Sequence, residues 1–216
     1  MSMENNEQTP ISKRKPGRPS TNDSRKQEII DKATQCFFKF GYNKTTLDEI
    51  GESIGFNKAA LYYYFKNKEE LFVQVLNNQI KHGLINLKTN IEEIENPENK
   101  FFQYFWHRTK VISNVLRLTN LSNENILDLH TTFESIYSPF KKSEKDFLAK
   151  IITTLAPHKS KTEIDNFVSL CFDVVNSLSL SALMLQNILS KDSTFEEYNK
   201  KKDTVLQHLL TSFRLK

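Results

Sequence analysis

Residues 46–71 have the sequence TLDEIGESIGFNKAALYYYFKNKEEL, and this stretch decides the fold of the N-terminal part of the chain. Apolar side chains recur in it at the spacing of a helix: Leu47, Ile50, Ile54, Leu61 and Phe65. Gly55 ends the first run, and Asn57 opens the second. Two short helices that cross at a glycine-containing turn form a helix-turn-helix, which lays its second helix in the major groove of DNA. The stretch therefore predicts contact with DNA.

Capping patterns mark where the surrounding helices should begin. A Ser, Thr or Asn is followed three positions later by Glu or Gln at four expected helix starts, namely Ser24 with Gln27, Thr46 with Glu49, Asn67 with Glu70, and Ser193 with Glu196. The polar, proline-containing residues 1–23 show no apolar periodicity and predict a flexible basic arm. We therefore expect a three-helix domain over residues 24–67 and a regulatory and dimerisation domain over residues 68–216.

The composition favours an all-α protein. Only 5 Gly and 6 Pro occur in 216 residues, too few for long sheets with many turns. About nine helices are expected: three in the helix-turn-helix domain, a connecting fourth, and a larger helical bundle. Thr162 with Asp165 is expected to open the penultimate helix, and Ser138-Pro139 to separate two others. The last five should cover about residues 98–119, 124–137, 143–156, 162–190 and 193–214.

Several classes of protein are disfavoured. No apolar run approaches the roughly 18 residues of a membrane span, and the first ten residues lack the basic and apolar regions of a signal peptide. Cys36 and Cys171 lie in apolar helical contexts, typical of buried free thiols in a reducing cytosol. The 5 His show no metal-ligand spacing, and no nucleotide-binding or nucleophile motif is present. We expect a cytoplasmic protein that is not an enzyme and has no cofactor, metal or membrane partner.

The motif also supplies candidate DNA contacts. Thr46 and Lys68 stand at helix N-termini, where free N–H groups and the helix dipole attract phosphate. The hydroxyl of Tyr62 can also bond a phosphate. Residues at the exposed start of the second helix can reach base edges, and these are Lys58, Ala59, Ala60 and Tyr63. The alternative is a three-helix module whose tyrosines cap its own core, and we favour that reading for Tyr64.

At these residues a resemblance becomes visible. Residues 24–76 resemble the DNA-binding domain of TetR-family transcriptional regulators, because T-x-x-x-I at 46–50 precedes IGFNKAALYYYFKNKEEL at the family's spacing. The resemblance implies a homodimer on a near-palindromic operator in double-stranded DNA, and usually repression that a ligand relieves. It also implies phosphate contacts for Thr46, Tyr62 and Lys68. Gly51, Phe56 and Asn57 depart from the family's common residues, which affects base preference rather than fold.

The arm holds a second basic signal, KRKPGRPS at residues 13–20. Its Gly17-Arg18-Pro19 core resembles an AT-hook, in which Arg18 would enter a narrow A·T minor groove. Pro16 stands where an arginine is usual. The equally open alternative is an arm that adds non-specific phosphate affinity.

The C-terminal part offers candidates for dimerisation and ligand binding. By family analogy, apolar stripes of the last two helices form the dimer interface: Phe167, Val174, Leu178, Leu185, Leu206 and Leu210. Within one chain the same stripes would simply be core. A small apolar or amphipathic ligand could occupy a pocket lined by Phe105, Trp106, His130, Phe133 and Tyr137, although ordinary aromatic core explains each of them alone.

Two other functions stay open at this point. One is a sequence-tolerant architectural DNA-binding protein that uses the arm and the helix-turn-helix for general binding. The other is a regulator that is independent of ligand or activates transcription.

Overall fold

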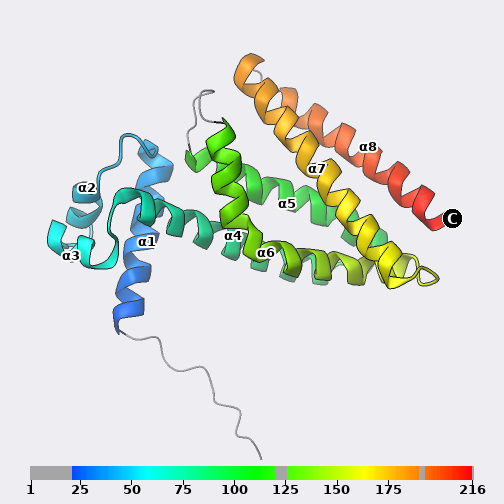
Figure 1. Ribbon diagram of the computed structural model, residues 1–216, viewed down its shortest axis with the longest axis horizontal. Coiled ribbons are helices and arrows are strands. Elements are labelled where there is room, and N and C mark those ends of the chain that lie inside the picture. Colours follow the sequence, from blue (N-terminus) through cyan, green and yellow to red (C-terminus); the bar gives the residue numbers. More distant parts are fainter. Residues whose placement is uncertain (1–20, 120–125, 190–192, 216) are drawn as a thin grey trace, which may run out of the picture.

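The computed structural model describes residues 21–119, 126–189 and 193–215, and within these ranges it contains α-helices and no strands. Figure 1 shows a small group of helices, α1 to α3, joined through the long α4 to a bundle of longer helices. The eight helices are α1 (Thr21–Phe40), α2 (Leu47–Glu52), α3 (Lys58–Tyr64), α4 (Lys68–Glu92), α5 (Pro97–Thr119), α6 (Ile126–Leu155), α7 (Lys161–Leu189) and α8 (Ser193–Leu215). The all-α prediction is confirmed.

One predicted break is wrong, so the described residues form eight helices rather than nine. The chain runs through Ser138 and Pro139 as a single helix, α6. A proline inside a helix removes one backbone donor and costs about 3 kcal/mol. Buried side chains on both sides of the proline, including Tyr137 and Leu148, hold the two halves in line. Tertiary packing thus outweighs the local preference for a break.

Two predicted helix starts are also corrected. Helix α1 begins at Thr21, so Ser24 lies within the helix instead of capping it. Helix α7 begins at Lys161, because the capping pair is Ser160 with Glu163 rather than Thr162 with Asp165. The Ser160 hydroxyl and backbone N–H both donate to the Glu163 carboxylate, at 2.7 and 2.9 Å. The predicted starts of α2, at Thr46, and of α4, at Asn67, are confirmed.

The N-terminal core forms where α1, α2 and α3 meet the first turns of α4. Its fully buried members come from all four helices and from the C-cap of α3: Ile29, Ala33, Phe37, Ile50, Leu61, Phe65, Leu71 and Val75. Phe37 also contacts the ring of Phe72 edge-on, with centroids 5.0 Å apart. Phe40, the last residue of α1, is 49% exposed and lies outside this core, beneath the Lys39 ammonium.

Helix α4 belongs to both parts of the molecule. Its first half packs on α1, and its second half buries Leu84, Leu87 and Ile91 against the bundle. At Gly83 the helix passes so close to α5 that an added Cβ would lie 2.6 Å from Cγ1 of Val111. A movement of α4 relative to α5 would therefore carry the helix-turn-helix with it.

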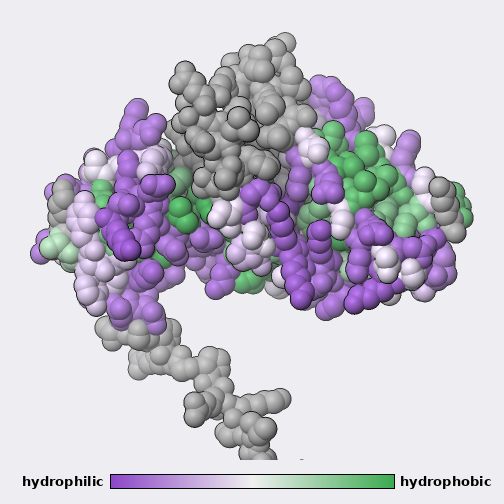
Figure 2. Space-filling view, viewed as in Figure 1, coloured by the Kyte–Doolittle hydropathy of each residue, from purple (hydrophilic) through white to green (hydrophobic). Residues whose placement is uncertain are grey.

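The bundle comprises α5 to α8, with α6 against α5 and α7 against α8 (Figure 1). Figure 2 shows hydrophobic residues gathered over the α7–α8 end, whereas hydrophilic residues dominate the face around α1.

Cys171 is buried in the core of the bundle, which raises the pKa of its thiol to about 12, and Cys36 is half-buried. Both thiols are free. In the described ranges, no helix combines the length and the apolar character that crossing a membrane requires.

Candidate nucleic-acid interface and regulatory core

The turn between α2 and α3 is held by close backbone contacts. Gly55 has φ +71°, a left-handed conformation that glycine adopts without strain. The N–H of Phe56 donates to the carbonyl of Gly51 at 2.8 Å. A Cβ at position 51 would lie 2.8 Å from the Phe56 carbonyl oxygen and 2.9 Å from Cδ1 of Leu61. Both glycines therefore allow the close approach that the motif requires.

The capping box at the start of α2 uses the Thr46 hydroxyl. The N–H of Glu49 donates to this hydroxyl at 3.2 Å, and the N–H of Thr46 donates to the Glu49 carboxylate at 2.9 Å. The hydroxyl itself also bonds the carboxylate, at 3.0 Å. Thr46 is exposed. A phosphate approaching this helix end would compete with Glu49 for the hydroxyl proton, and the predicted contact stays a prediction.

Helix α3 presents the candidate base-contacting residues. Asn57 caps it by accepting the N–H of Ala60 at 2.8 Å. Tyr62 and Tyr63 are 46% and 76% exposed, so neither ring is needed for the core. Ala59 is exposed and Ala60 half-buried. Lys58 is the first residue of α3, and its side chain lies outside the described residues.

Tyr64 behaves differently from the two tyrosines before it. It is half-buried and stacks on Phe56 with ring centroids 6.4 Å apart. Tyr63 meets it edge-on at 5.1 Å. The Arg25 guanidinium lies 5.6 Å from the Phe56 ring centroid, which ties the start of α1 to the turn. The structural role that the sequence favoured for Tyr64 agrees with this packing.

Lys68 connects α4 to the loop before α2. Its ammonium donates to the carbonyls of Tyr42 and Thr45, at 2.9 and 3.1 Å, and lies 4.3 Å from the Tyr42 ring centroid. An ammonium has three donors, so one remains for a phosphate. Lys68 thus fixes the position of the loop that presents Thr46, a role that the sequence pattern did not reveal. The predicted phosphate contact is untested, and Arg18 of the arm lies outside the described residues.

These features define a class: an all-α protein with a helix-turn-helix at one end and a helical bundle at the other. Residues 29–75 match the family model described as bacterial regulatory proteins, tetR family. The helix-turn-helix domain of this chain is therefore similar to that of TetR-family regulators, as its resemblance implied.

Similar proteins include named regulators. The chain is 30% identical over 130 residues to the negative transcriptional regulator IcaR of the icaADBC biofilm operon from Staphylococcus epidermidis, covering 60% of this chain and 64% of that protein. It is 41% identical over 75 residues to the regulator QacR from Staphylococcus aureus, covering 32% of this chain and 40% of that protein. The matched stretches span less than two thirds of either relative.

Solved structures show that the likeness of fold extends over most of the chain. A transcriptional regulator from Cytophaga hutchinsonii superposes with a TM-score of 0.70 at 24% identity, covering 88% of this chain and 98% of that one. A TetR/AcrR-family regulator from Thermobifida fusca gives 0.53 at 20% identity, covering 87% and 97%. The helical bundle as well as the motif therefore has the fold of these regulators.

The predicted pocket residues do not gather around one cavity. Tyr137 lines a cavity of about 380 Å³ between α6 and α7. Phe105 is fully buried and packs edge-on against Phe172, with centroids 5.7 Å apart. Trp106 is half-buried, with the ammonium of Lys202 5.4 Å from its ring centroid. The side chains of His130 and Phe133 lie outside the described residues.

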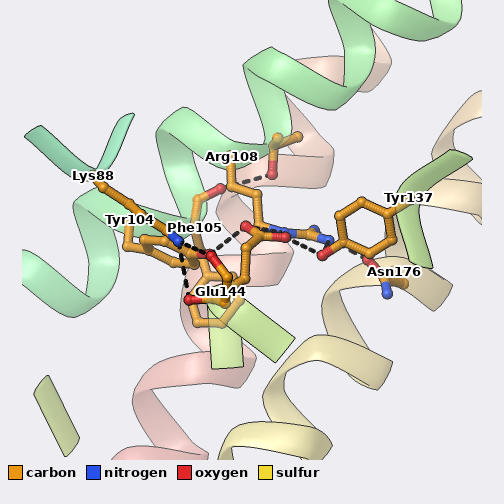
Figure 3. A network of polar contacts seen from close by, with 9 residues as sticks. Lys88, Tyr104, Phe105, Arg108, Tyr137, Glu144 and Asn176 are labelled. Carbon is orange, nitrogen blue, oxygen red and sulfur yellow. Dashed lines mark hydrogen bonds and ion pairs between the residues drawn. The ribbon is translucent and has the colours of Figure 1, made fainter. Parts of the chain in front are cut away.

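A buried polar network beside that cavity was not predicted. Arg108 of α5 and Glu144 of α6 are 2% and 0% exposed, and their guanidinium and carboxylate groups pair at 3.2 Å. Figure 3 shows three partners converging on this pair. The hydroxyls of Tyr104 and Tyr137 donate to the two carboxylate oxygens, and the Asn176 amide oxygen accepts from the guanidinium at 3.1 Å. The network joins α5, α6 and α7.

The network keeps its charges because they compensate each other. Burial alone would lower the pKa of Arg108, but Glu144 and the two tyrosines raise it above its ordinary value. Burial, reinforced by Glu144, raises the pKa of Tyr104 well above its usual range. Burial also raises the pKa of Tyr137, although Arg108 opposes that shift. Arg108 stays charged and both phenols stay protonated at neutral pH.

Helix α4 touches this cluster through Lys88. Its ammonium donates to the carbonyl of Ser143 at 3.0 Å and bonds the Ser143 hydroxyl, directly beside Glu144. Burial lowers the pKa of Lys88, with Glu144 acting in the opposite direction. The helix that follows the helix-turn-helix is thus joined to the polar network of the bundle. The sequence did not predict this arrangement, because a single Lys, Arg or Glu in a helical pattern does not indicate a contact with another helix.

The predicted dimer residues divide into two groups. Phe167, Leu206 and Leu210 are 5%, 0% and 0% exposed, so they form the core within one chain. Val174 and Leu178 are half-buried, and the side chain of Leu185 lies outside the described residues. Leu170 and Val205, on the same two helices, are 45% and 36% exposed. The apolar surface left for a partner therefore consists of Leu170, Val174, Leu178 and Val205.

Proposed function

We propose that the protein is a dimeric, cytoplasmic transcriptional regulator that binds a specific DNA site and represses transcription until a small molecule binds its helical bundle. The observation that carries the proposal is the exposed face of α3, where Tyr62 and Tyr63 project from a motif of the TetR family. The similar IcaR is a negative transcriptional regulator, which supports this direction of control.

DNA binding would divide the residues into two roles. Thr46, Tyr62 and Lys68 would contact phosphates, which fix orientation and carry no sequence information. Lys58, Ala60 and Tyr63 would meet bases or adjacent backbone, with Ala59 beside them. Alanine can only touch a thymine methyl, so few side chains are left to read base edges. Specificity would then also depend on DNA shape and on the spacing of two half-sites.

Dimerisation would supply that second half-site. Leu170, Val174 and Leu178 follow one another at four-residue spacing along α7, on a side of the helix that the protomer covers only in part. Val205 of α8 adds to this partly exposed apolar surface. Two copies joined through α7 and α8 would form a four-helix interface related by two-fold symmetry, matching a near-palindromic operator.

Release would follow from the position of α4. A ligand that favours a different arrangement of the bundle would tilt α4, change the separation of the two α3 helices, and lower operator affinity. The contact of Gly83 with Val111 and the bonds of Lys88 to Ser143 are the places where α4 would transmit such a change.

Selection of bound sites from random duplex DNA by the full chain tests this proposal. We expect the enriched sequences to contain two inverted half-sites about 10 base pairs apart, or a multiple of that spacing. Enrichment of A·T content without a repeated motif would favour the architectural alternative. Deleting residues 1–22 would then show whether A·T-rich flanks are read by the arm, since an unchanged flank preference would exclude the minor-groove role of Arg18.

A further inference from the structure

The cavity of about 380 Å³ between α6 and α7 is lined mainly by groups that form hydrogen bonds or carry charge. Six of its eight lining residues are of this kind: Glu134, Lys141, Lys145, Asp173, Asn176 and Ser177. The other two are Tyr137 and Phe172, which are 2% and 4% exposed, because their rings pack around the Arg108 guanidinium. The accessible wall is therefore polar, in contrast to the apolar or amphipathic pocket that the sequence predicted.

The charges on this wall are only partly paired. Lys141 and Glu134, both on α6, form an ion pair with each other. Lys145 of α6 donates to the Ser169 hydroxyl at 3.0 Å, which is a neutral partner. Asp173 of α7 has no hydrogen-bond or ion-pair partner among the described residues. One ammonium and one carboxylate thus border the cavity from opposite helices without neutralising each other.

The groups behind the wall add no net charge, since Arg108 and Glu144 compensate each other. A lone anion would be attracted by Lys145 but repelled by Asp173. A lone cation would be attracted by Asp173 but repelled by Lys145. Hydrogen bonds to charged groups are the stronger ones, so a molecule that satisfies both ends gains most.

We infer that this cavity binds a small zwitterion, a molecule with a carboxylate directed at Lys145 and an ammonium directed at Asp173. This inference rests on the proposed function in one respect, because it takes the bound molecule to be the ligand of the regulator. The polar side chains of Asn176 and Ser177 line the same cavity. The volume is at the lower end for small-molecule sites, which fits a metabolite the size of an amino acid.

The site also has a route to α4. Tyr137 and Asn176 line the cavity and both bond Arg108, at 2.7 and 3.1 Å. Arg108 pairs with Glu144, and the adjacent Ser143 accepts from Lys88 of α4. An occupant that moves the Asn176 amide therefore changes the partners of a fully buried cation, and the change reaches the helix that carries the DNA-binding domain.

Isothermal titration calorimetry of the full chain without DNA tests the inference. The probes are the zwitterions glycine, γ-aminobutyrate and ε-aminocaproate, which differ in charge separation, together with the acid caproate and the amine hexylamine. We expect at least one zwitterion to bind about tenfold or more tightly than both the acid and the amine, since each single-charge probe loses one charge-assisted hydrogen bond.

Two substitutions assign the charged ends. Lys145→Gln should reduce zwitterion affinity about tenfold and remove its advantage over the amine, and Asp173→Asn should remove its advantage over the acid. Lys150→Gln and Asp165→Asn, on exposed faces of the same helices, should change nothing.

Failure of all three zwitterions to bind, or binding of caproate or hexylamine as tightly as the best zwitterion, would overturn the inference. Operator binding is measured separately on the same preparation, so its loss would count against the proposed function and not against the cavity.

Discussion

Tyr62 and Lys68 have different roles at the candidate nucleic-acid interface. Lys68 is half-buried, and its ammonium donates two hydrogen bonds to backbone carbonyls. It therefore stabilises the motif and also lies at its surface. Tyr62 is 46% exposed, so about half of its surface remains open to a partner. Lys68 therefore stabilises the surface of the motif, and Tyr62 is positioned to contact a partner there.

Replacing Tyr62 by Phe should lower the affinity for DNA of any sequence by about tenfold, because one hydrogen bond to a charged phosphate is lost. The temperature of unfolding should not change, since the hydroxyl is outside the core. Fluorescence anisotropy with specific and random duplexes measures the effect. Tyr64→Phe is the matched control and should bind as the unaltered chain does. Equal affinity of Tyr62→Phe and the unaltered chain would remove Tyr62 from the phosphate contacts.

Glu163 offers a second test at the residue scale, through pH. Hydrogen bonds from Ser160 and Lys159 lower the pKa of this exposed carboxylate from its ordinary value of 4.5 to about 2. A lowered pKa in the folded state means that the stabilisation is present above pH of about 4.5 and is lost as pH falls toward 2. Glu163→Gln should therefore flatten the pH dependence of the free energy of unfolding in that window, measured by urea denaturation. An unchanged slope would show that the capping pair is not formed in solution.

At the scale of the elements, the buried network determines how α5, α6 and α7 fit together. A fully buried ion pair gives little net stability, yet removing one partner leaves the other charge uncompensated. Four neighbours, Tyr104, Tyr137, Asn176 and Phe172, are arranged around Arg108 and Glu144, so the packing of three helices depends on this pair.

Single substitutions should reveal that dependence. Arg108→Met or Glu144→Leu alone should lower the free energy of unfolding by about 3–5 kcal/mol, because one buried charge remains. The double variant should recover a large part of the loss. Chemical denaturation of the four proteins completes a double-mutant cycle. Additive losses in the double variant would contradict the coupling that the geometry indicates.

Some helix boundaries could be predicted from the sequence, and the predictions that failed did so for physical reasons. Capping residues at Thr46 and Asn67 located two helix starts, because the cap is a local interaction. The break at Pro139 was wrong, since packing on both sides of the proline outweighs a local cost. The Arg108–Glu144 pair was invisible because its members lie on different helices 36 positions apart. Contacts between distant helices leave no periodic signal in one sequence.

At the scale of the whole molecule, α4 links the helix-turn-helix domain to the helical bundle. The helix-turn-helix depends on close local contacts, and its family was recognisable from about a quarter of the chain. The bundle shares its fold with regulators that are 24% and 20% identical to this chain, and a shared fold does not specify a ligand or an interface. The interface and ligand therefore had to be inferred from burial and charge.

The proposed dimer makes a prediction about association. Leu170→Glu should shift the chain to monomer in sedimentation velocity, because a charge would be buried at the apolar surface of α7. Operator affinity should fall with it, since one α3 helix reads too few bases. Phe38→Glu is the control, as Phe38 is 52% exposed on α1 and should leave the dimer intact. A dimer that persists in Leu170→Glu would place the interface elsewhere.

The central claim is that this chain chooses a DNA sequence, and the ratio of specific to non-specific affinity tests it most directly. The affinity of the full chain for a selected site is measured at physiological salt in competition with random duplex of the same length. We predict a preference of about 1,000-fold or more for the selected site, as specific regulators show. Nearly equal competition by random duplex would contradict the account and identify a sequence-tolerant DNA-binding protein.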